Sequence, residues 1–379
     1  MNLRLIKILR TLLIVVPAIF FVGCQDSDSP ITQKKSGKSI SVENHLYFKE
    51  NLPVKSIYVG GRTNFQEILD TLKKYGANAV VIDVKDDFGK LFPDLPVTYN
   101  KKNQFISNNN FKSLIQKLKE NKIYTIARIV ALRESIRDDL CIKKEDGSLM
   151  IDKEKMSWMD PKDERVLQYL EEICSAAIKI GFDEVQLDYV RFSSYFRLYE
   201  NENETEAHAS NRSRIDAINN LIDRIGTSVH KLSGKLSVCV FGCTIEGSVD
   251  TPDKKNQTEK SSEILGQDYI EIAKRADYIC PMIYPSHYPK DTPCGIKDPD
   301  LEPYKTISIC MKLSNDMINT ASEKNLKAKV RPYLQAFTAK WLKTHLQYGK
   351  KEINDQIRAV LDSGTTEQWG LFHMAGRYP

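Results

Sequence analysis

Short β-rich runs alternate with longer amphipathic runs along most of this chain, and this alternation restricts its fold more than any other feature. Strands that alternate with helices in sequence usually lie parallel, because each helix returns the chain to the same edge of the sheet. The predicted strands are 56–61, 79–85, 123–131, 184–192, 236–241, 278–284, 329–337 and 368–374. The predicted helices between them are 64–75, 111–121, 163–180, 213–232, 268–275, 303–324 and 352–363.

Eight strands with intervening helices predict an α/β fold of the (β/α)8 TIM-barrel type, as one domain over 54–379. The connections after strands three, four and five are enlarged, at 134–161, 193–211 and 242–267. Each of them joins the C-terminal end of a strand to the next helix. Barrel proteins build their sites on this face, so we expect a site there.

The N-terminal segment has the pattern of a secretory signal. Three basic residues precede an apolar stretch at 11–22 that is too short to span a bilayer comfortably. The stretch ends in Phe21-Val22-Gly23-Cys24, which is similar to a bacterial lipobox. We expect a signal peptide at 1–23, a lipidated Cys24 that begins a polar tether at 24–53, and a lipoprotein anchored in the bacterial cell envelope, facing the periplasm or the exterior. The alternative is an ordinary signal peptide with a chance cysteine.

Charge and cysteine usage exclude several classes of protein. The formal net charge is +5, three units of which lie in the predicted signal peptide, and no dense basic stripe suggests nucleic acid as a partner. Seven of the eight cysteines remain once Cys24 is assigned to lipidation, and their scattered positions predict buried thiols rather than a disulfide framework. No cysteine or histidine spacing suggests a metal site, and we expect no metal and no cofactor.

Strand alternation predicts which polar side chains face the barrel interior. In the second strand Val80, Ile82 and Val84 should pack outward against helices, which turns Asp83 and Lys85 inward. Buried charges need mutual pairing or a polar ligand, so two interpretations stay open: a salt-bridge network that fills the barrel, and a ligand site, which we favour. The same alternation gives the full inward set as Asp83, Lys85, Arg128, Gln186, Asp188, Tyr284, Arg331 and Gln335.

Six motifs follow one another in the order of these strands. They are NAVVIDVKDDFGKL from Asn78, IYTIARIV from Ile123, WMDP from Trp158, GFDEVQLDYVRF from Gly181, PMIYPSHY from Pro281 and RPYLQAFT from Arg331. Together they resemble the "putative glycosyl hydrolase domain" family, long catalogued only as a domain of unknown function. The resemblance runs from about Lys55 to Tyr378 and implies a TIM barrel like those of glycoside hydrolases.

The family motifs carry over to this chain residue by residue. Asp188 and Arg191 match the Asp-Tyr-Val-Arg-Phe motif, Asp83 and Lys85 match the second-strand motif, and Arg128 matches the third. Further matches are Tyr284, Ser286 and His287 in the sixth strand and Gln335 in the seventh.

The chain also departs from the family pattern at several positions. Cys239 and Ala336 stand where the family has aspartates, and Glu134 replaces another aspartate. Near the end of the chain Phe372-His373 replaces a Trp-Asn pair. Such losses of carboxylates bear on catalysis and leave the fold untouched.

Hydrolysis of a glycosidic bond uses two carboxyl groups, one as proton donor and one as nucleophile or base. We predict a glycosidase acting on a cell-envelope or extracellular polysaccharide, with Asp188 as nucleophile or stabiliser and Glu134 or Asp83 as proton donor. The alternative is a non-catalytic carbohydrate-binding lipoprotein on a degenerate barrel. A chitinase-like mechanism ranks low, because Val190 stands where such a site needs Glu. The predicted substrate-binding residues are Lys85, Arg128, Gln186, Arg191, Tyr284, His287, Arg331 and Gln335.

Overall fold

The structure is a computed structural model. The predicted signal peptide, Cys24 and all but the last two residues of the predicted tether lie outside the residues that it describes. In the part of the chain that the structure describes, none of the helices combines the length and the apolar character of a membrane span. The described residues are 52–61, 64–92, 95, 97–98, 111–144, 146–193, 204–246, 264–293, 295–321 and 326–379.

Eight parallel strand positions close into a barrel, which confirms the predicted (β/α)8 fold. The strand order is β10-β11-β1-β2-β3-β6-β7-β8-β9, and a further pairing of β10 with β8 completes the circle. Seven positions are single strands: β1 (Lys55–Gly60), β2 (Ala79–Lys85), β3 (Tyr124–Val130), β6 (Glu184–Asp188), β7 (Lys235–Phe241), β8 (Tyr278–Met282) and β11 (Trp369–Phe372).

The seventh strand differs from the prediction, because it is divided into β9 (Lys329–Val330) and β10 (Tyr333–Gln335). The break falls at Arg331-Pro332, where proline has a fixed φ and no N–H for the strand ladder. Pro332 still accepts a hydrogen bond from the Gly370 N–H at 2.9 Å, so the two halves keep one course along the barrel wall.

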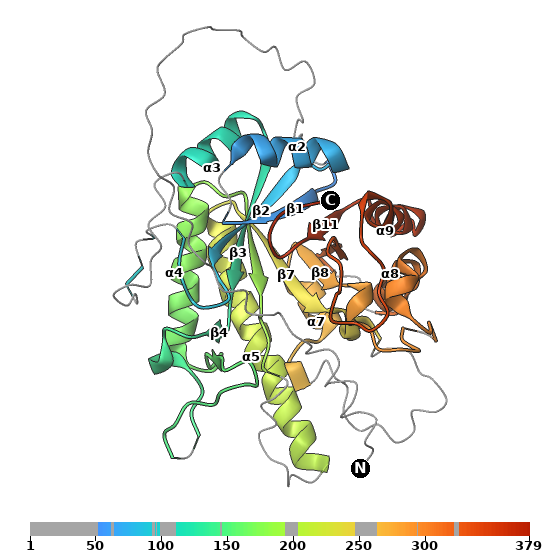
Figure 1. The fold of residues 1–379 in the computed structure, drawn as a ribbon. Coiled ribbons are helices and arrows are strands. Elements are labelled where there is room, and N and C mark those ends of the chain that lie inside the picture. The colour runs from blue at the N-terminus through green and yellow to red at the C-terminus, as the bar shows by residue number, and fades with distance from the viewer. Residues whose placement is uncertain are drawn as a thin grey trace, which may run out of the picture.

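Helices surround this barrel (Figure 1). Local signals explain their ends: the Asn64 side chain accepts from the Glu67 N–H at the start of α2, and Gly76 ends that helix with φ 66°. The helices are α2 (Phe65–Tyr75), α3 (Phe111–Glu120), α4 (Glu164–Ile180), α5 (Glu204–Lys231), α7 (Tyr269–Arg275), α8 (Pro303–Thr320) and α9 (Lys350–Asp362).

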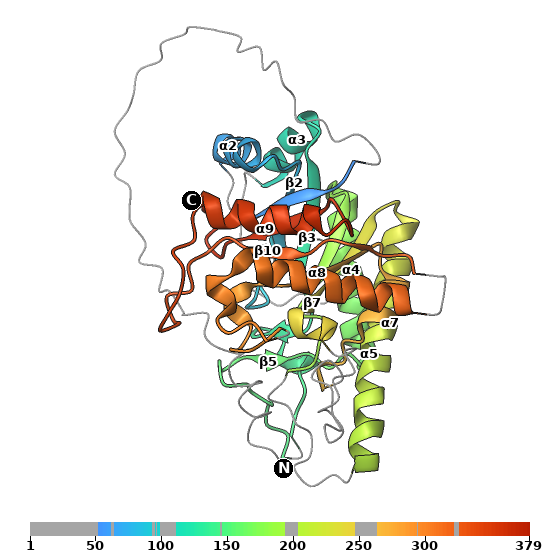
Figure 2. The ribbon, with the colours of Figure 1, turned by 90° about the vertical axis from the view of Figure 1, so that its right-hand side faces the viewer.

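Helix α5 begins at Glu204, although the sequence predicted a start at 213. The extra residues are polar apart from Ala207 and Ala209 and carry no apolar stripe, so periodicity could not identify them as helix. The N-terminal part of α5 extends beyond the barrel on the side where the short strands β4 (Arg133–Glu134) and β5 (Ser157–Trp158) lie (Figures 1 and 2). The predicted loop after the fourth strand is therefore partly helical.

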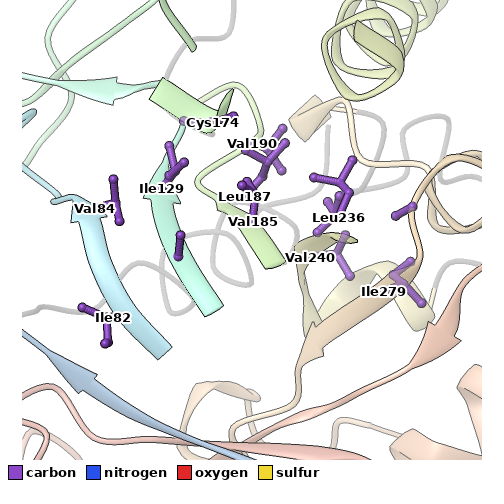
Figure 3. Packing of buried hydrophobic residues seen from close by; sticks show 14 of the residues in the cluster. Ile82, Val84, Ile129, Cys174, Val185, Leu187, Val190, Leu236, Val240 and Ile279 are labelled. Carbon is purple, nitrogen blue, oxygen red and sulfur yellow. The ribbon is translucent and has the colours of Figure 1, made fainter. Parts of the chain in front are cut away.

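Packing confirms the predicted alternation of side chains. Val80, Ile82 and Val84 belong to the large cluster between strands and helices, whereas Val81 belongs to the cluster inside the barrel. Each fully buried aliphatic side chain of this kind contributes roughly 1.5–3 kcal/mol. Figure 3 shows part of the outer cluster, including Ile82, Val84, Ile129, Val185, Leu187, Leu236, Val240 and Ile279.

A tyrosine hydroxyl completes the seam between the first and last strands. β1 pairs with β11 only from Lys55 to Ile57, and its register shifts after Tyr58. The Tyr378 hydroxyl accepts from the Tyr58 N–H at 2.9 Å, and it lies 2.8 Å from the Tyr58 carbonyl oxygen and 2.9 Å from that of Leu371, to which it can donate. This hydroxyl therefore takes the place of a strand-to-strand hydrogen bond.

Candidate active site at the carboxyl ends of the strands

Asp188 is the last residue of β6, and both of its carboxylate oxygens are held. Oδ2 accepts from Nε of Arg128 at 2.9 Å and lies 2.8 Å from Nη2 of the same guanidinium group. Oδ1 accepts from the Tyr189 N–H at 2.8 Å. The side chain keeps 11% of its surface exposed to solvent.

Arg128 of β3 connects Asp188 to two further carboxylates. Its Nη1 donates to Oδ1 of Asp83 at 2.8 Å, and its Nη2 donates to Oδ1 of Asp87 at 3.3 Å. Burial lowers the pKa of Arg128, but Asp87, Asp188 and Asp83 outweigh burial and raise the pKa well above its ordinary value. The guanidinium group is therefore a permanent positive charge at the centre of the cluster.

Asp83 of β2 differs from Asp188 in its surroundings. The Tyr58 hydroxyl donates to its Oδ2 at 2.5 Å. Burial raises the pKa of Asp83, and the Arg128 charge lowers it. The negative charge of Asp87 raises it further, so the net pKa of Asp83 lies above that of an ordinary aspartate. Oδ1 of Asp83 and Oδ2 of Asp188 lie at most about 8 Å apart, because each contacts a nitrogen of one rigid guanidinium group.

Lys85 and Glu134 are brought together, but away from any open surface. Nζ of Lys85 lies 3.2 Å from Oε2 of Glu134, and both side chains have 0% exposure. Lys85 also donates to the carbonyl oxygens of Val130 and Arg133, and Oε1 of Glu134 accepts from two backbone N–H groups. A proton donor has to reach the leaving oxygen of the substrate, so the structure argues against Glu134 as proton donor and against Lys85 as a substrate-binding residue.

The remaining inward residues do not all converge on Asp188. Arg331 pairs with Glu184, which lies at the other end of β6, and both side chains have 0% exposure. The Tyr333 hydroxyl donates to Gln186 at 2.8 Å, deeper in the barrel than Asp188. These buried pairs fill the barrel, as the salt-bridge interpretation expected for part of the set.

The Gln335 side chain holds the connection after β8 in place through hydrogen bonds. Its side-chain oxygen accepts from the Ser286 N–H at 2.9 Å, and its Nε2 donates to Asp300 at 3.0 Å. The side chain is fully buried, so it holds the segment that carries His287 rather than contacting a ligand.

A group of aromatic side chains, which we call the aromatic wall, lies beside the carboxylates. Its members are Tyr58, Tyr284, His287, Phe337, Trp341 and Phe372. Strand alternation identified only part of this group. Phe372 has its ring centroid 4.9 Å from that of Tyr58 and stacks on Tyr284 at 5.7 Å. His287 packs edge-on against Tyr284 and Trp341. Burial lowers the pKa of His287 to about 4, so the ring is neutral at neutral pH. Strand alternation did not identify Phe372 and the neighbouring Phe337 as site residues. The signal that could have identified them is that both are aromatic residues near the ends of predicted strands.

Two other predicted features have a definite place. Arg191 is only 4% exposed and packs among aromatic rings, so it does not face a ligand directly. Cys239 lies in the interior cluster, whereas Ala336 lies in the outer cluster, so of these two positions only Cys239 faces the barrel interior. Within the described residues, no group of three or more His, Cys, Asp or Glu side chains could hold a metal ion.

A (β/α)8 barrel with carboxylates at the C-terminal ends of its strands has the architecture of the glycoside-hydrolase type. The model of the family described as "Putative glycosyl hydrolase domain" matches residues 53–378, and the chain belongs to this family. No curated protein matches the chain.

Solved structures of low sequence identity share the fold. The glycoside hydrolase domain of PgaB (BpsB) from Bordetella bronchiseptica is 12% identical with a TM-score of 0.59, covering 86% of this chain and 95% of that one. The C-terminal domain of a "putative chitinase" from Desulfitobacterium hafniense DCB-2 is 12% identical with a TM-score of 0.50, with the same coverages of 86% and 95%. These similarities concern the barrel alone.

Proposed function

We propose that this protein hydrolyses glycosidic bonds in a cell-envelope or extracellular polysaccharide, using Asp188 and Asp83 as its two carboxyl groups. The observation that carries the proposal is their arrangement on the single guanidinium group of Arg128. Their separation of at most about 8 Å is compatible with the spacing of about 5–9.5 Å between the carboxyl groups of glycosidases.

The surroundings of the two carboxyl groups suit different roles. Burial raises the pKa of Asp83, so this residue keeps a proton to higher pH and suits the proton donor to the leaving oxygen. Arg128 and the Tyr189 N–H hold both oxygens of Asp188 in place at the end of β6, which suits the carboxyl group that attacks the anomeric carbon or activates water. With Asp83 as the acid, the rate falls as pH rises through its raised pKa.

The aromatic wall suits sugar rings. Trp341 stacks on Phe337 with a centroid distance of 5.9 Å, and Trp341 and Phe372 are both partly exposed. Phe88, in the loop after β2 next to Asp87, is 55% exposed. Apolar faces of sugars pack on such rings, which supports a carbohydrate ligand at this end of the barrel.

One observation favours a second function, carbohydrate binding without catalysis. Cys239 occupies the interior position where the resembled family has an aspartate, and it lies in the same interior cluster as Tyr284. A site that lost a carboxylate there can keep its aromatic wall and bind a polysaccharide without cleaving it.

For the location, we propose a lipoprotein anchored through Cys24 in the bacterial cell envelope. Support comes from the sequence alone: a basic start, a short apolar stretch and a lipobox-like end. This location would place the barrel beside envelope or extracellular polysaccharides.

A polysaccharide screen tests the catalytic proposal. We expect the wild type to release reducing ends from at least one polysaccharide and Asp188→Asn to lose roughly 10²–10⁴-fold in rate. Asp277→Asn is the matched control, since Asp277 accepts from the Leu236 N–H near the opposite ends of the strands. Equal turnover by wild type and Asp188→Asn contradicts the role of Asp188. Binding of a polysaccharide without any turnover by the wild type supports the second function instead.

A further inference from the structure

Tyr189, the residue after Asp188, adopts a conformation that side chains rarely take. Its φ is 50°, in the left-handed region that costs a residue other than glycine roughly 1–2 kcal/mol. In this conformation its N–H donates to Oδ1 of Asp188 at 2.8 Å, and its carbonyl oxygen accepts from the Leu132 N–H at 3.3 Å. The strained turn therefore orients the carboxylate, and surrounding contacts have to offset its cost.

Arg191 is the buried cation next to this turn. It is only 4% exposed; its Nη1 donates to the Phe192 carbonyl oxygen, and its Nε is buried without a hydrogen-bond partner. No carboxylate among the described residues forms an ion pair with Arg191, although Arg128 and Arg133 both have such partners. Burial lowers the pKa of Arg191 to about 10, which leaves it charged at neutral pH.

Aromatic rings take the place of a counterion. The guanidinium carbon lies 4.3 Å from the ring centroid of Phe241, 4.6 Å from that of Trp158 and 5.2 Å from that of Tyr189. Each such contact contributes roughly 0.5–2 kcal/mol. These rings come from β5, β7 and the turn itself, so Arg191 joins three segments around Tyr189.

The Tyr189 ring is contacted by two cations. Arg133 lies 5.3 Å from its centroid and pairs with Glu154, and the Trp158 ring lies 5.9 Å away. Ring contacts with both arginines restrict where the side chain can go, and through it they restrict the backbone at φ 50°. Replacing Arg191 with a neutral residue removes one of these contacts. Fewer contacts then offset the free-energy cost of the left-handed conformation at Tyr189.

We propose that Arg191 is a positioning residue, which clamps the Tyr189 ring and so holds the Tyr189 N–H against the Asp188 carboxylate. The role in catalysis rests on the proposed function of Asp188, whereas the clamp itself does not. Arg191 then acts through Tyr189 and touches no substrate, in place of the substrate contact that its motif suggested.

Two measurements on the full chain test the clamp in the Arg191→Gln variant. Amide hydrogen exchange, followed by NMR, should become roughly tenfold faster or more at Tyr189 and stay unchanged at Val185 in β6, because only the turn loosens. On a cleaved polysaccharide, kcat should fall roughly tenfold or more with KM unchanged, since a displaced carboxylate affects the transition state rather than binding.

Two further variants serve as controls. Arg137→Gln is the matched one, because Arg137 is also 4% exposed and stacks on a tyrosine, Tyr169, at 5.1 Å, but pairs with Asp139; it should leave exchange at Tyr189 unchanged. Arg191→Lys keeps the charge without the planar group that stacks on rings, and should give intermediate values of exchange and kcat.

Unchanged exchange at Tyr189, or equal acceleration at Tyr189 and Val185, would overturn the clamp. A raised KM with unchanged kcat would show substrate contact and overturn it as well. If Arg191→Gln does not fold, Phe241→Leu removes the nearest ring and should change exchange and kcat in the same direction to a smaller extent. If no polysaccharide is cleaved, the exchange measurement still decides the clamp, so its failure and that of the proposed function remain distinguishable.

Discussion

Lys85 and Arg128 are cations on neighbouring strands with opposite surroundings. Lys85 and its partner Glu134 have side chains with 0% exposure, whereas Asp83 and Asp188 around Arg128 keep 10% and 11%. The first pair fastens the segment after β3 to the end of β2. The carboxylate side chains of the second cluster stay partly exposed to solvent, so exposure rather than charge separates the structural pair from the candidate site.

Replacing Lys85 should destabilise the protein strongly. Lys85→Met leaves the Glu134 carboxylate buried without its ion-pair partner, which costs about 3–5 kcal/mol, whereas Lys85→Met with Glu134→Gln should cost less than the single change. Urea unfolding gives the free energies. Lys351→Met is the control, because Lys351 pairs with Asp355 at 2.9 Å but is 80% exposed, and it should change stability by less than about 1 kcal/mol. A similar loss in both lysine variants would contradict this account.

Side-chain alternation predicted the facing of these residues but could not predict their partners. Asp83, Arg128 and Asp188 point inward as expected and meet. Arg331 has the same alternation, yet it pairs with Glu184 at the far end of the barrel. A period of two residues gives the face of a strand, whereas depth depends on strand stagger, which only the closed barrel defines.

At the scale of elements, the sequence predicted the ends of a helix correctly where a local signal marked them. Asn64 and Gly76 marked the ends of α2 correctly. The prediction did not include the polar start of α5 at Glu204, because periodicity does not report a polar helical extension. It also did not include the division of the seventh strand at Pro332, although a proline within a β-rich run is the signal for such a break. The Tyr378 contact with β1 could not be predicted, since it joins residues 320 positions apart.

The seam between β1 and β11 should depend on the Tyr378 hydroxyl. Tyr378→Phe leaves the Tyr58 N–H without its partner, which should lower the free energy of unfolding by about 1–3 kcal/mol. Tyr304→Phe is the matched control, because the Tyr304 hydroxyl donates to Asp362 at an exposed site and its loss should change little. Equal unfolding midpoints for wild type and Tyr378→Phe would show that the seam does not need this hydroxyl.

At the scale of the whole molecule, the proposed lipid anchor can be tested independently of the barrel. Expressed in full in a bacterium, the wild type should fractionate with membranes and carry lipid on Cys24, whereas Cys24→Ser should be released from them. Cys243→Ser, which changes a partly buried cysteine of the barrel, should stay with the membranes. Membrane retention of Cys24→Ser without lipid would count against the anchor; mass spectrometry of the N-terminal peptide supplies the second reading.

The pairing of β1 with β11 also determines when this protein can fold. Ser56 and Ile57 can pair with β2 as soon as that strand is available, but the other partners of β1 lie at Trp369–Leu371, more than 300 residues later. Until those residues emerge, β1 and the strands that follow it form an open sheet with unpaired edges, which is prone to pair with other chains. Closure of the barrel is therefore a step of high contact order, which cannot occur before the last strand is available.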